Sequence, residues 1–347
     1  MRFEDIIGND ELKLRLTQMV EQNRLGHAIL FQENPGSGAL SIALALAQYV
    51  NCRNHSDSDS CGECNSCYKY NKLIHPDLHF VFPVNSSSLL SESEKKAPIS
   101  DFFINQWRQL LLDNPYFTEQ ELYDNIGIEN KSGNIGVNEA KRIFEKLSLR
   151  ASEGDYKTMI IFLPERMNQE ASNKLLKLLE EPPLGTLFLL VSQAVEKLLP
   201  TIRSRCQIVN VKPLTREESA KVKVQSVPEE YLAILDQLLS ASTQKSLINT
   251  FPVWESIAEL GREKQKDFCL YAESFVRKMY LCSNSLSDIS DAAQSERTVI
   301  DRYLPQIKSD FYQKAFGFFE SALKMIDANV NAKLLFCDLA NRFFLSV

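Results

Sequence analysis

Four cysteines lie close together near the start of the chain, at Cys52, Cys61, Cys64 and Cys67. Four thiolates at this spacing are sufficient for closed tetrahedral coordination of Zn²⁺. An all-thiolate set leaves no open coordination position for a substrate or an activated water, so such a zinc ion is structural. The sequence therefore predicts a zinc module over about residues 52–67 that folds a loop and catalyses no reaction.

Three alternatives to this zinc module stay open. The cysteines could form a redox pair or stay as separate thiols, although clustered cysteines in a reducing compartment more often bind metal. His55 could replace one cysteine as a ligand. The module could also bind nucleic acid, but the acidic side chains beside it would repel phosphate. These acids are Asp57, Asp59 and Glu63.

A second motif has the form of a phosphate-binding loop without its phosphate contacts. A working P-loop reads G-x-x-x-x-G-K-[ST]: glycines let backbone N–H groups approach the phosphates, lysine neutralises their charge, and the hydroxyl binds magnesium. Aligned on Gly38, with Gly36 in the same turn, the chain has Glu33, Ala39 and Leu40 at the first-glycine, lysine and hydroxyl positions. Losing the lysine contact alone removes about 1.5 to 3 kcal/mol. We predict no productive ATP binding; an ordinary glycine turn is the alternative from the loop alone.

The acidic half of a nucleotide site is missing as well. ATPases of this type end a hydrophobic strand with two acids, one for magnesium and one that positions the attacking water. The strand predicted from Thr158 ends instead with Phe162 and Leu163, followed by Pro164. Neither Phe162 nor Leu163 can bind a metal or a proton. The phosphate contacts and the two acids are both missing, although the strand, turn and helix around them remain. The sequence therefore predicts a P-loop protein that does not hydrolyse ATP.

Composition limits the class of protein. The 347 residues are 44% hydrophobic, enough for two or three domains with buried cores. A net charge of -6 and an isoelectric point near 5.5 argue against a surface devoted to nucleic acid. No apolar run approaches the roughly 20 residues that span a bilayer, and the acidic N-terminal residues are unlike a signal peptide. We therefore expect a cytoplasmic protein with no membrane partner.

The elements that would hold these motifs alternate between strand and helix over the first two thirds of the chain, which predicts a parallel sheet covered by helices. Strands are expected at 28–31, 79–84, 158–163, 186–191 and 207–211, and helices at 9–22, 40–49, 137–149 and 169–179. Residues 85–134 interrupt the alternation as an insertion. Its apolar residues would share one face of a helix. They are Ile99, Phe102, Phe103, Trp107, Leu110 and Leu111.

After about residue 213 the pattern is helical to the end of the sequence. Thr215, followed three residues later by Glu218, has the spacing of a capping box and predicts the start of a helix. Pro252 marks a further expected boundary. We therefore expect a core at 1–213 with the zinc module and the insertion, a helical lid at 214–252, and an all-α domain at 253–347.

These features together resemble the delta-prime subunits of bacterial DNA polymerase III clamp loaders, a family of the AAA+ superfamily. Besides the cysteine cluster, the resemblance rests on the stretches FEDIIG (3–8), NRLGHA (23–28), ASNKLLKLLEEP (171–182) and SRC (204–206). It implies an α/β AAA+ P-loop core with a zinc module, then a helical lid and a C-terminal all-α collar that joins subunits. The insertion at 85–134 and Pro164 depart from the family pattern.

The resemblance also implies a role and partners. A member would be the stationary, non-catalytic subunit of a ring that opens the sliding clamp and loads it onto primed DNA, beside the gamma or tau ATPase subunits and the delta subunit. DNA polymerase activity would belong to the holoenzyme. Arg205, in the SRC tripeptide, would act in trans as an arginine finger on the neighbour's ATP, because its planar, always charged group suits charge developing on the γ-phosphate. From the tripeptide alone, a surface arginine is the alternative.

Two other functions stay open on the residues alone. The chain could be an active ATPase that recruits an unusual lysine and acid, or a zinc-containing protein that binds nucleic acid by itself. Ser192 matches the place where relatives keep a nucleotide-sensing residue. Glu180 and Glu181 end a predicted helix before two prolines, and we interpret them as solvated or paired charges.

Overall fold

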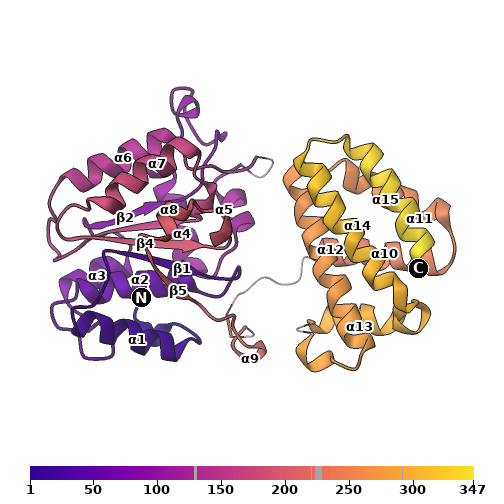
Figure 1. Cartoon of the computed structure of the whole chain (residues 1–347), viewed down its shortest axis with the longest axis horizontal. Coiled ribbons are helices and arrows are strands. Elements are labelled where there is room, and N and C mark those ends of the chain that lie inside the picture. The colour runs from indigo at the N-terminus through magenta and orange to yellow at the C-terminus, as the bar shows by residue number, and fades with distance from the viewer. Residues whose placement is uncertain (129–130, 220, 223–228, 291) are drawn as a thin grey trace. The chain divides into compact units, whose positions relative to one another are not determined.

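The computed structural model describes residues 1–128, 131–219, 221–222, 229–290 and 292–347. They form two compact units, Met1–Val224 and Gln225–Val347. The first unit contains the cysteine cluster and the glycine loop, and the second is helical (Figure 1). Within the described ranges, no helix combines the length and apolarity that a membrane span requires.

A parallel sheet forms the centre of the first unit. Its strands are β1 (Ala28–Gln32), β2 (Leu78–Val81), β3 (Lys157–Phe162), β4 (Thr186–Ser192) and β5 (Gln207–Asn210). They lie in the order β2-β3-β4-β1-β5, so the glycine loop after β1 and the end of β3 reach the same edge. Every residue of β3 and β4 is buried, as expected for strands covered on both faces.

The predicted strands are all present, although β2 is clearly shorter than expected and β5 ends one residue early. The expected strand at 79–84 ends at Val81, because Pro83 has no N–H to continue the ladder. Helices α1 and α2 cover one face of the sheet and α6 and α7 the other (Figure 1). The helices of this unit are α1 (Asp10–Glu21), α2 (Ala39–Val50), α3 (Asn65–Asn71), α4 (Ile104–Asp113), α5 (Glu119–Asn125), α6 (Val137–Ser148), α7 (Gln169–Glu180), α8 (Pro200–Arg203) and α9 (Arg216–Ser219).

The insertion at 85–134 packs into the core of the first unit. Trp107 of α4 is fully buried, stacks on Phe82 with ring centroids 4.2 Å apart, and meets Phe117 edge-on at 5.3 Å. The expected single helical face is correct for Trp107 but wrong for Phe102, which is 39% exposed. A 3₁₀ turn over Ser100–Phe103 precedes α4, and its tighter winding turns Phe102 outward.

The second unit is a bundle of helices around one apolar core. Trp254 of α11, Phe268 of α12 and Phe336 of α15 are all fully buried there. The bundle contains α10 (Glu229–Thr243), α11 (Leu247–Ala258), α12 (Arg262–Ser283), α13 (Gln294–Tyr303), α14 (Ser309–Asp327) and α15 (Ala332–Ser346).

The domain limits differ from those expected near 213 and 252. The Thr215–Glu218 capping box is present, but α9, which it starts, groups with the first unit. Pro252 stands inside α11 and ends no helix. A proline removes one backbone hydrogen bond, but the packing of Trp254 and Ile257 in the shared core holds α11 together across it. Residues on both sides of position 252 therefore belong to one core.

Candidate nucleotide and metal sites

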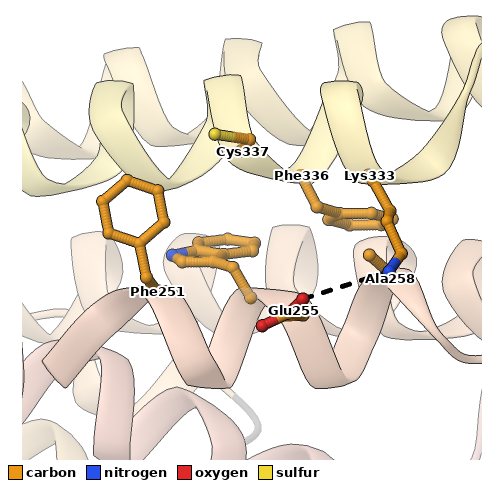
Figure 2. Close-up of a pocket in the computed structure, with 7 residues that line it drawn as sticks. Phe251, Glu255, Ala258, Lys333, Phe336 and Cys337 are labelled. Atoms are coloured by element: carbon orange, nitrogen blue, oxygen red, sulfur yellow. Dashed lines mark ion pairs between the residues drawn. The ribbon is translucent and has the colours of Figure 1, made fainter. Parts of the chain in front are cut away.

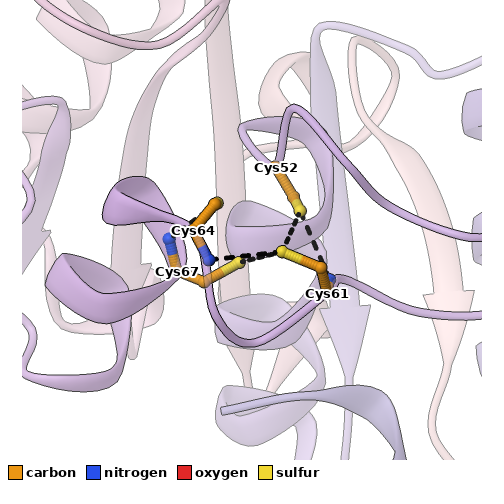
Figure 3. A group of neighbouring side chains, drawn as sticks. All are labelled: Cys52, Cys61, Cys64 and Cys67. Atoms are coloured by element: carbon orange, nitrogen blue, oxygen red, sulfur yellow. Dashed lines mark hydrogen bonds between the residues drawn. The ribbon is translucent and has the colours of Figure 1, made fainter.

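The four predicted metal ligands converge, although they come from two segments. Cys52 follows α2, whereas Cys61, Cys64 and Cys67 lie on the loop and helix of α3 (Figure 3). Their sulfur atoms all lie within 4.8 Å of one another, with Cys52 to Cys61 at 3.5 Å and Cys61 to Cys67 at 3.9 Å. Zinc–sulfur bonds of about 2.3 Å place tetrahedral sulfurs about 3.8 Å apart, whereas a disulfide needs about 2.05 Å. The cluster fits a metal ion and not a disulfide.

Backbone N–H groups orient the sulfurs. The N–H groups of Cys61, Cys64 and Cys67 donate to the sulfurs of Cys52, Cys61 and Cys64 at 3.3, 3.4 and 3.4 Å. The hydrogen bond from Cys64 N–H lowers the pKa of the Cys61 thiol to about 7, whereas burial raises the pKa of the Cys52 and Cys67 thiols. Such contacts fix the ligands in place as the outer shell of a metal site does.

His55 lies outside the sulfur cluster. Its Nδ1 is 3.3 Å from a carboxylate oxygen of Glu21, and its ring lies against Tyr49 with centroids 4.6 Å apart. Asp59 is also engaged, since its carboxylate accepts the N–H groups of Phe3 and Glu4 at 3.0 and 2.9 Å. The cysteine loop therefore holds the N-terminal residues in place through hydrogen bonds, which is a structural role.

The degenerate phosphate loop is filled by its own chain. Gly36 and Gly38 have φ of 78° and 89°, the left-handed conformation that bends the loop into α2. Glu33, which replaces the first glycine of the motif, turns back into the loop and is only 6% exposed. Its Oε2 accepts the N–H of Ala39 at 2.9 Å. Burial raises the pKa of the Glu33 carboxyl to about 7.

Tyr116 of the insertion covers the same loop. Its ring lies so close to Gly38 that a β carbon there would stand 2.6 Å from a ring carbon. The Tyr116 hydroxyl accepts the N–H of Ile7 at 3.1 Å, and the carbonyl of Pro115 accepts the hydroxyl of Ser41 on α2 at 3.3 Å. No local pattern predicts this contact, because it joins positions far apart in the chain.

Apolar packing occupies the place of the missing acids. Phe162, at the end of β3, packs against Trp107 and Phe117 with ring centroids 5.7 and 5.5 Å apart. Leu163 is buried with φ of 53°, and its N–H donates to the carbonyl of Val191 in β4 at 2.8 Å. The end of β3 is therefore part of the hydrophobic core.

A partly buried carboxyl that no motif predicted, that of Glu165, lies close enough to Glu33 of the phosphate loop to raise the pKa of Glu33. Glu165 accepts the N–H groups of Gln193 and Ala194 at 2.8 and 3.1 Å, and burial raises the pKa of its carboxyl. Ser192, the expected sensor position, is fully buried at the end of β4. Glu165 stands two residues after the degenerate acidic motif, and this offset is the signal that could have found it.

Arg205 is held by its own chain. Its guanidinium pairs with the Glu180 carboxylate of α7 at 2.7 Å, and its Nη1 donates to the carbonyl of Thr201 at 3.1 Å. This agrees with the interpretation of Glu180 as a paired charge. Both side chains are more than a third exposed, so the ion pair is weak and can exchange for another partner.

A hollow in the second unit could hold a small group. It measures about 250 Å³ between α11 and α15 (Figure 2). Phe251, Trp254 and Phe336 line it, and Glu255 and Lys333 face each other at its edge at 4.0 Å. These are packing residues with one weak ion pair, and they indicate no reaction.

The family can be identified with this geometry in view. The model of the family described as DNA polymerase III, delta subunit, matches residues 8–215, which include the cysteine cluster, the filled loop and Arg205. The chain belongs to this family. The match covers more than half of the sequence and ends close to the expected limit of the core.

Individual relatives agree with this family. The chain is 26% identical over 264 residues to DNA polymerase III subunit delta' of Haemophilus influenzae, which covers 76% of this chain and 65% of the relative. It is 30% identical over 209 residues to subunit delta' of Bacillus subtilis, with coverage of 59% and 49%. The matches thus span about half to two thirds of these relatives. A DNA polymerase III gamma subunit-related protein of Thermotoga maritima superposes with a TM-score of 0.42 at 18% identity, covering 96% of this chain and 99% of that one.

Proposed function

We propose that the chain is a non-catalytic clamp-loader subunit that helps to place the sliding clamp on primed DNA. The observation that carries this proposal is the filled phosphate loop. The Ala39 N–H, which in a working loop would face phosphate, already donates to Glu33, and no lysine or hydroxyl follows Gly38. A subunit of this kind contributes to its assembly through its surface and not through its own turnover.

In this proposal the cysteine cluster holds Zn²⁺ and keeps the loop around it folded. An all-thiolate donor set at these sulfur–sulfur distances suits zinc and leaves no open position for catalysis. The helical second unit, Gln225–Val347, joins a collar with the gamma or tau ATPase subunits and the delta subunit. Contact with the clamp and DNA is made through this complex.

Arg205 acts in trans as an arginine finger on the ATP of the neighbouring subunit. Its exposure and its weak pairing with Glu180 allow the guanidinium to change partners when a γ-phosphate approaches. Glu180 thus holds the guanidinium of Arg205 in the free subunit until a neighbour's nucleotide replaces it. An ATPase with atypical residues is the second candidate, because the partly buried Glu165 lies near Glu33 of the loop.

The test is reconstitution with clamp-loader ATPase and delta subunits, with the mass of the complex measured before activity. We expect Arg205→Ala to assemble normally and to lower DNA-stimulated ATP turnover by on the order of 10³-fold. Arg205→Lys should recover only part of this loss, because lysine keeps the charge but not the planar fork. Unchanged turnover of an assembled Arg205→Ala complex would refute the finger. Turnover by the parent chain alone would instead favour the second candidate.

A further inference from the structure

The start of α2 is where a P-loop protein binds phosphate. Backbone N–H groups there have no partner within the helix, and the helix dipole favours negative charge. In this chain the first of them, Ala39 N–H, donates to the buried carboxyl of Glu33 at 2.9 Å. A carboxyl oxygen offers the same acceptor chemistry as a phosphate oxygen. Glu33 therefore satisfies the donor that the phosphate would satisfy.

The space beyond this hydrogen bond is closed by the insertion. Tyr116 lies on Gly38, where its ring leaves no room even for a β carbon. Tyr116 is 7% exposed and its hydroxyl accepts the N–H of Ile7, while the carbonyl of the neighbouring Pro115 accepts the hydroxyl of Ser41 in α2. Tyr116 is therefore tied to the N-terminal segment, and its neighbour to the helix that follows the loop.

The rest of the insertion anchors Tyr116. Phe117, the next residue, packs between Trp107 of α4 and Phe162 at the end of β3. The same segment thus covers the phosphate loop with one aromatic ring and fills the place of the acidic motif with its neighbour. One segment, the insertion, therefore occupies both places where nucleotide-binding residues are missing: the phosphate loop and the end of β3.

We propose that Glu33 and Tyr116 together form a built-in occupant of the phosphate site, with the insertion as a permanent lid. The inference rests on the proposed non-catalytic role and gives it a mechanism. Restoring the motif residues would not be sufficient for nucleotide binding, because both the donor and the space are already taken. The first unit thus holds its loop in a filled conformation without a nucleotide.

The experiment restores the P-loop in two steps. In the chain of 347 residues, A39K and L40T supply the lysine and the hydroxyl, and E33G with these two completes the G-x-x-x-x-G-K-[ST] pattern. All four variants carry A39K and L40T: the first has no other change, the second adds E33G, the third adds Y116A, and the fourth adds both E33G and Y116A. Binding of radiolabelled Mg·ATP is measured at equilibrium for each, and F102A in the completed variant is the control for an aromatic deletion elsewhere in the insertion.

We expect the variant with both E33G and Y116A to bind Mg·ATP at least about 30-fold more tightly than any variant that keeps Glu33 or Tyr116. A change of this size corresponds to one or two restored charge-assisted hydrogen bonds. The F102A control should not gain binding. Equal binding with and without Tyr116 would overturn the lid, and equal binding with and without Glu33 would overturn the internal ligand. Absence of binding in all four variants, folded by circular dichroism, would overturn both.

A second measurement decides the matter if the multiple variants do not fold. Amide hydrogen exchange at residues 38–42 is followed in the parent chain and in Glu33→Gln, Glu33→Ala and Tyr116→Ala. Glu33→Gln keeps an acceptor for Ala39 N–H and should leave exchange within about threefold of the parent, whereas both alanine variants should speed it at least tenfold. Unchanged exchange in them overturns the proposal. Neither experiment uses partner subunits. The proposal of an internal occupant can therefore fail while the assembly role holds, and the assembly role can fail while this proposal holds.

Discussion

The two ends of α2 carry two sites with opposite outcomes. Beyond its C-terminal end, Cys52 joins three other cysteines whose sulfurs lie at metal-binding distances. At its N-terminal end, the phosphate loop has its donor bonded to Glu33 and its surface covered by Tyr116. The first site has four sulfurs at the spacing of metal ligands, whereas at the second site a side chain of the same chain already accepts the backbone N–H. The comparison teaches that residue types alone do not make a binding site, because the chain can satisfy the same donors itself.

Removing a metal ligand should have the largest effect. Binding at structural zinc sites contributes about 10 to 16 kcal/mol near neutral pH, and that free energy supports folding. We expect Cys61→Ser to lose most of its zinc and to lower the melting temperature of the first unit by about 10 °C or more. The measurements are elemental analysis for zinc and a thermal melt followed by circular dichroism.

The matched control for that variant is Cys337→Ser, which changes an exposed cysteine in the second unit. It should keep the zinc content and the melting temperature of the parent. If Cys61→Ser kept the zinc content and the melting temperature of the parent, the cysteine cluster would not depend on a metal ion. The two ends of α2 would then not differ in their need for a ligand.

Trp107→Ala tests whether the insertion is part of the core. The deletion leaves a cavity between Phe82, Phe117 and Phe162, and should cost about 3 to 5 kcal/mol of unfolding free energy. Phe102→Ala, on the exposed side of the same segment, should cost less than about 1 kcal/mol. Urea unfolding of the three chains measures both values. A loss below 1 kcal/mol for Trp107→Ala would mean that the insertion does not hold the loop closed.

Glu33→Gln gives the smallest effect and depends on pH. The pKa of Glu33 is raised from 4.5 to about 7 by burial, with the nearby Glu165 adding to the rise, so the folded chain binds this proton more tightly than the unfolded chain. The resulting stability is fully present below about pH 4.5 and is lost as the pH rises through about 7. The difference is at most about 3 kcal/mol.

Glutamine keeps an acceptor for Ala39 N–H but has no proton to lose. The stability of Glu33→Gln relative to the parent should therefore increase between pH 5 and pH 8, as measured by urea unfolding at several pH values. A constant difference over this range would show that Glu33 keeps the same charge in both states, and the loop would then be filled by an ordinary solvated carboxylate.

The sequence by itself determined the strands, the main helices of the core, the cysteine cluster and the loss of catalytic residue types. These depend on local pattern: strand and helix periodicity, cysteine spacing, and the identity of Glu33, Ala39 and Leu40 within one motif. Only the tertiary structure decided what occupies the phosphate loop, since Tyr116 reaches Gly38 from a distant segment. It also decided that α11 continues through Pro252 and that Phe102 faces outward. Contacts between distant residues cost chain entropy that only the whole packed core offsets, so no short stretch of sequence records them.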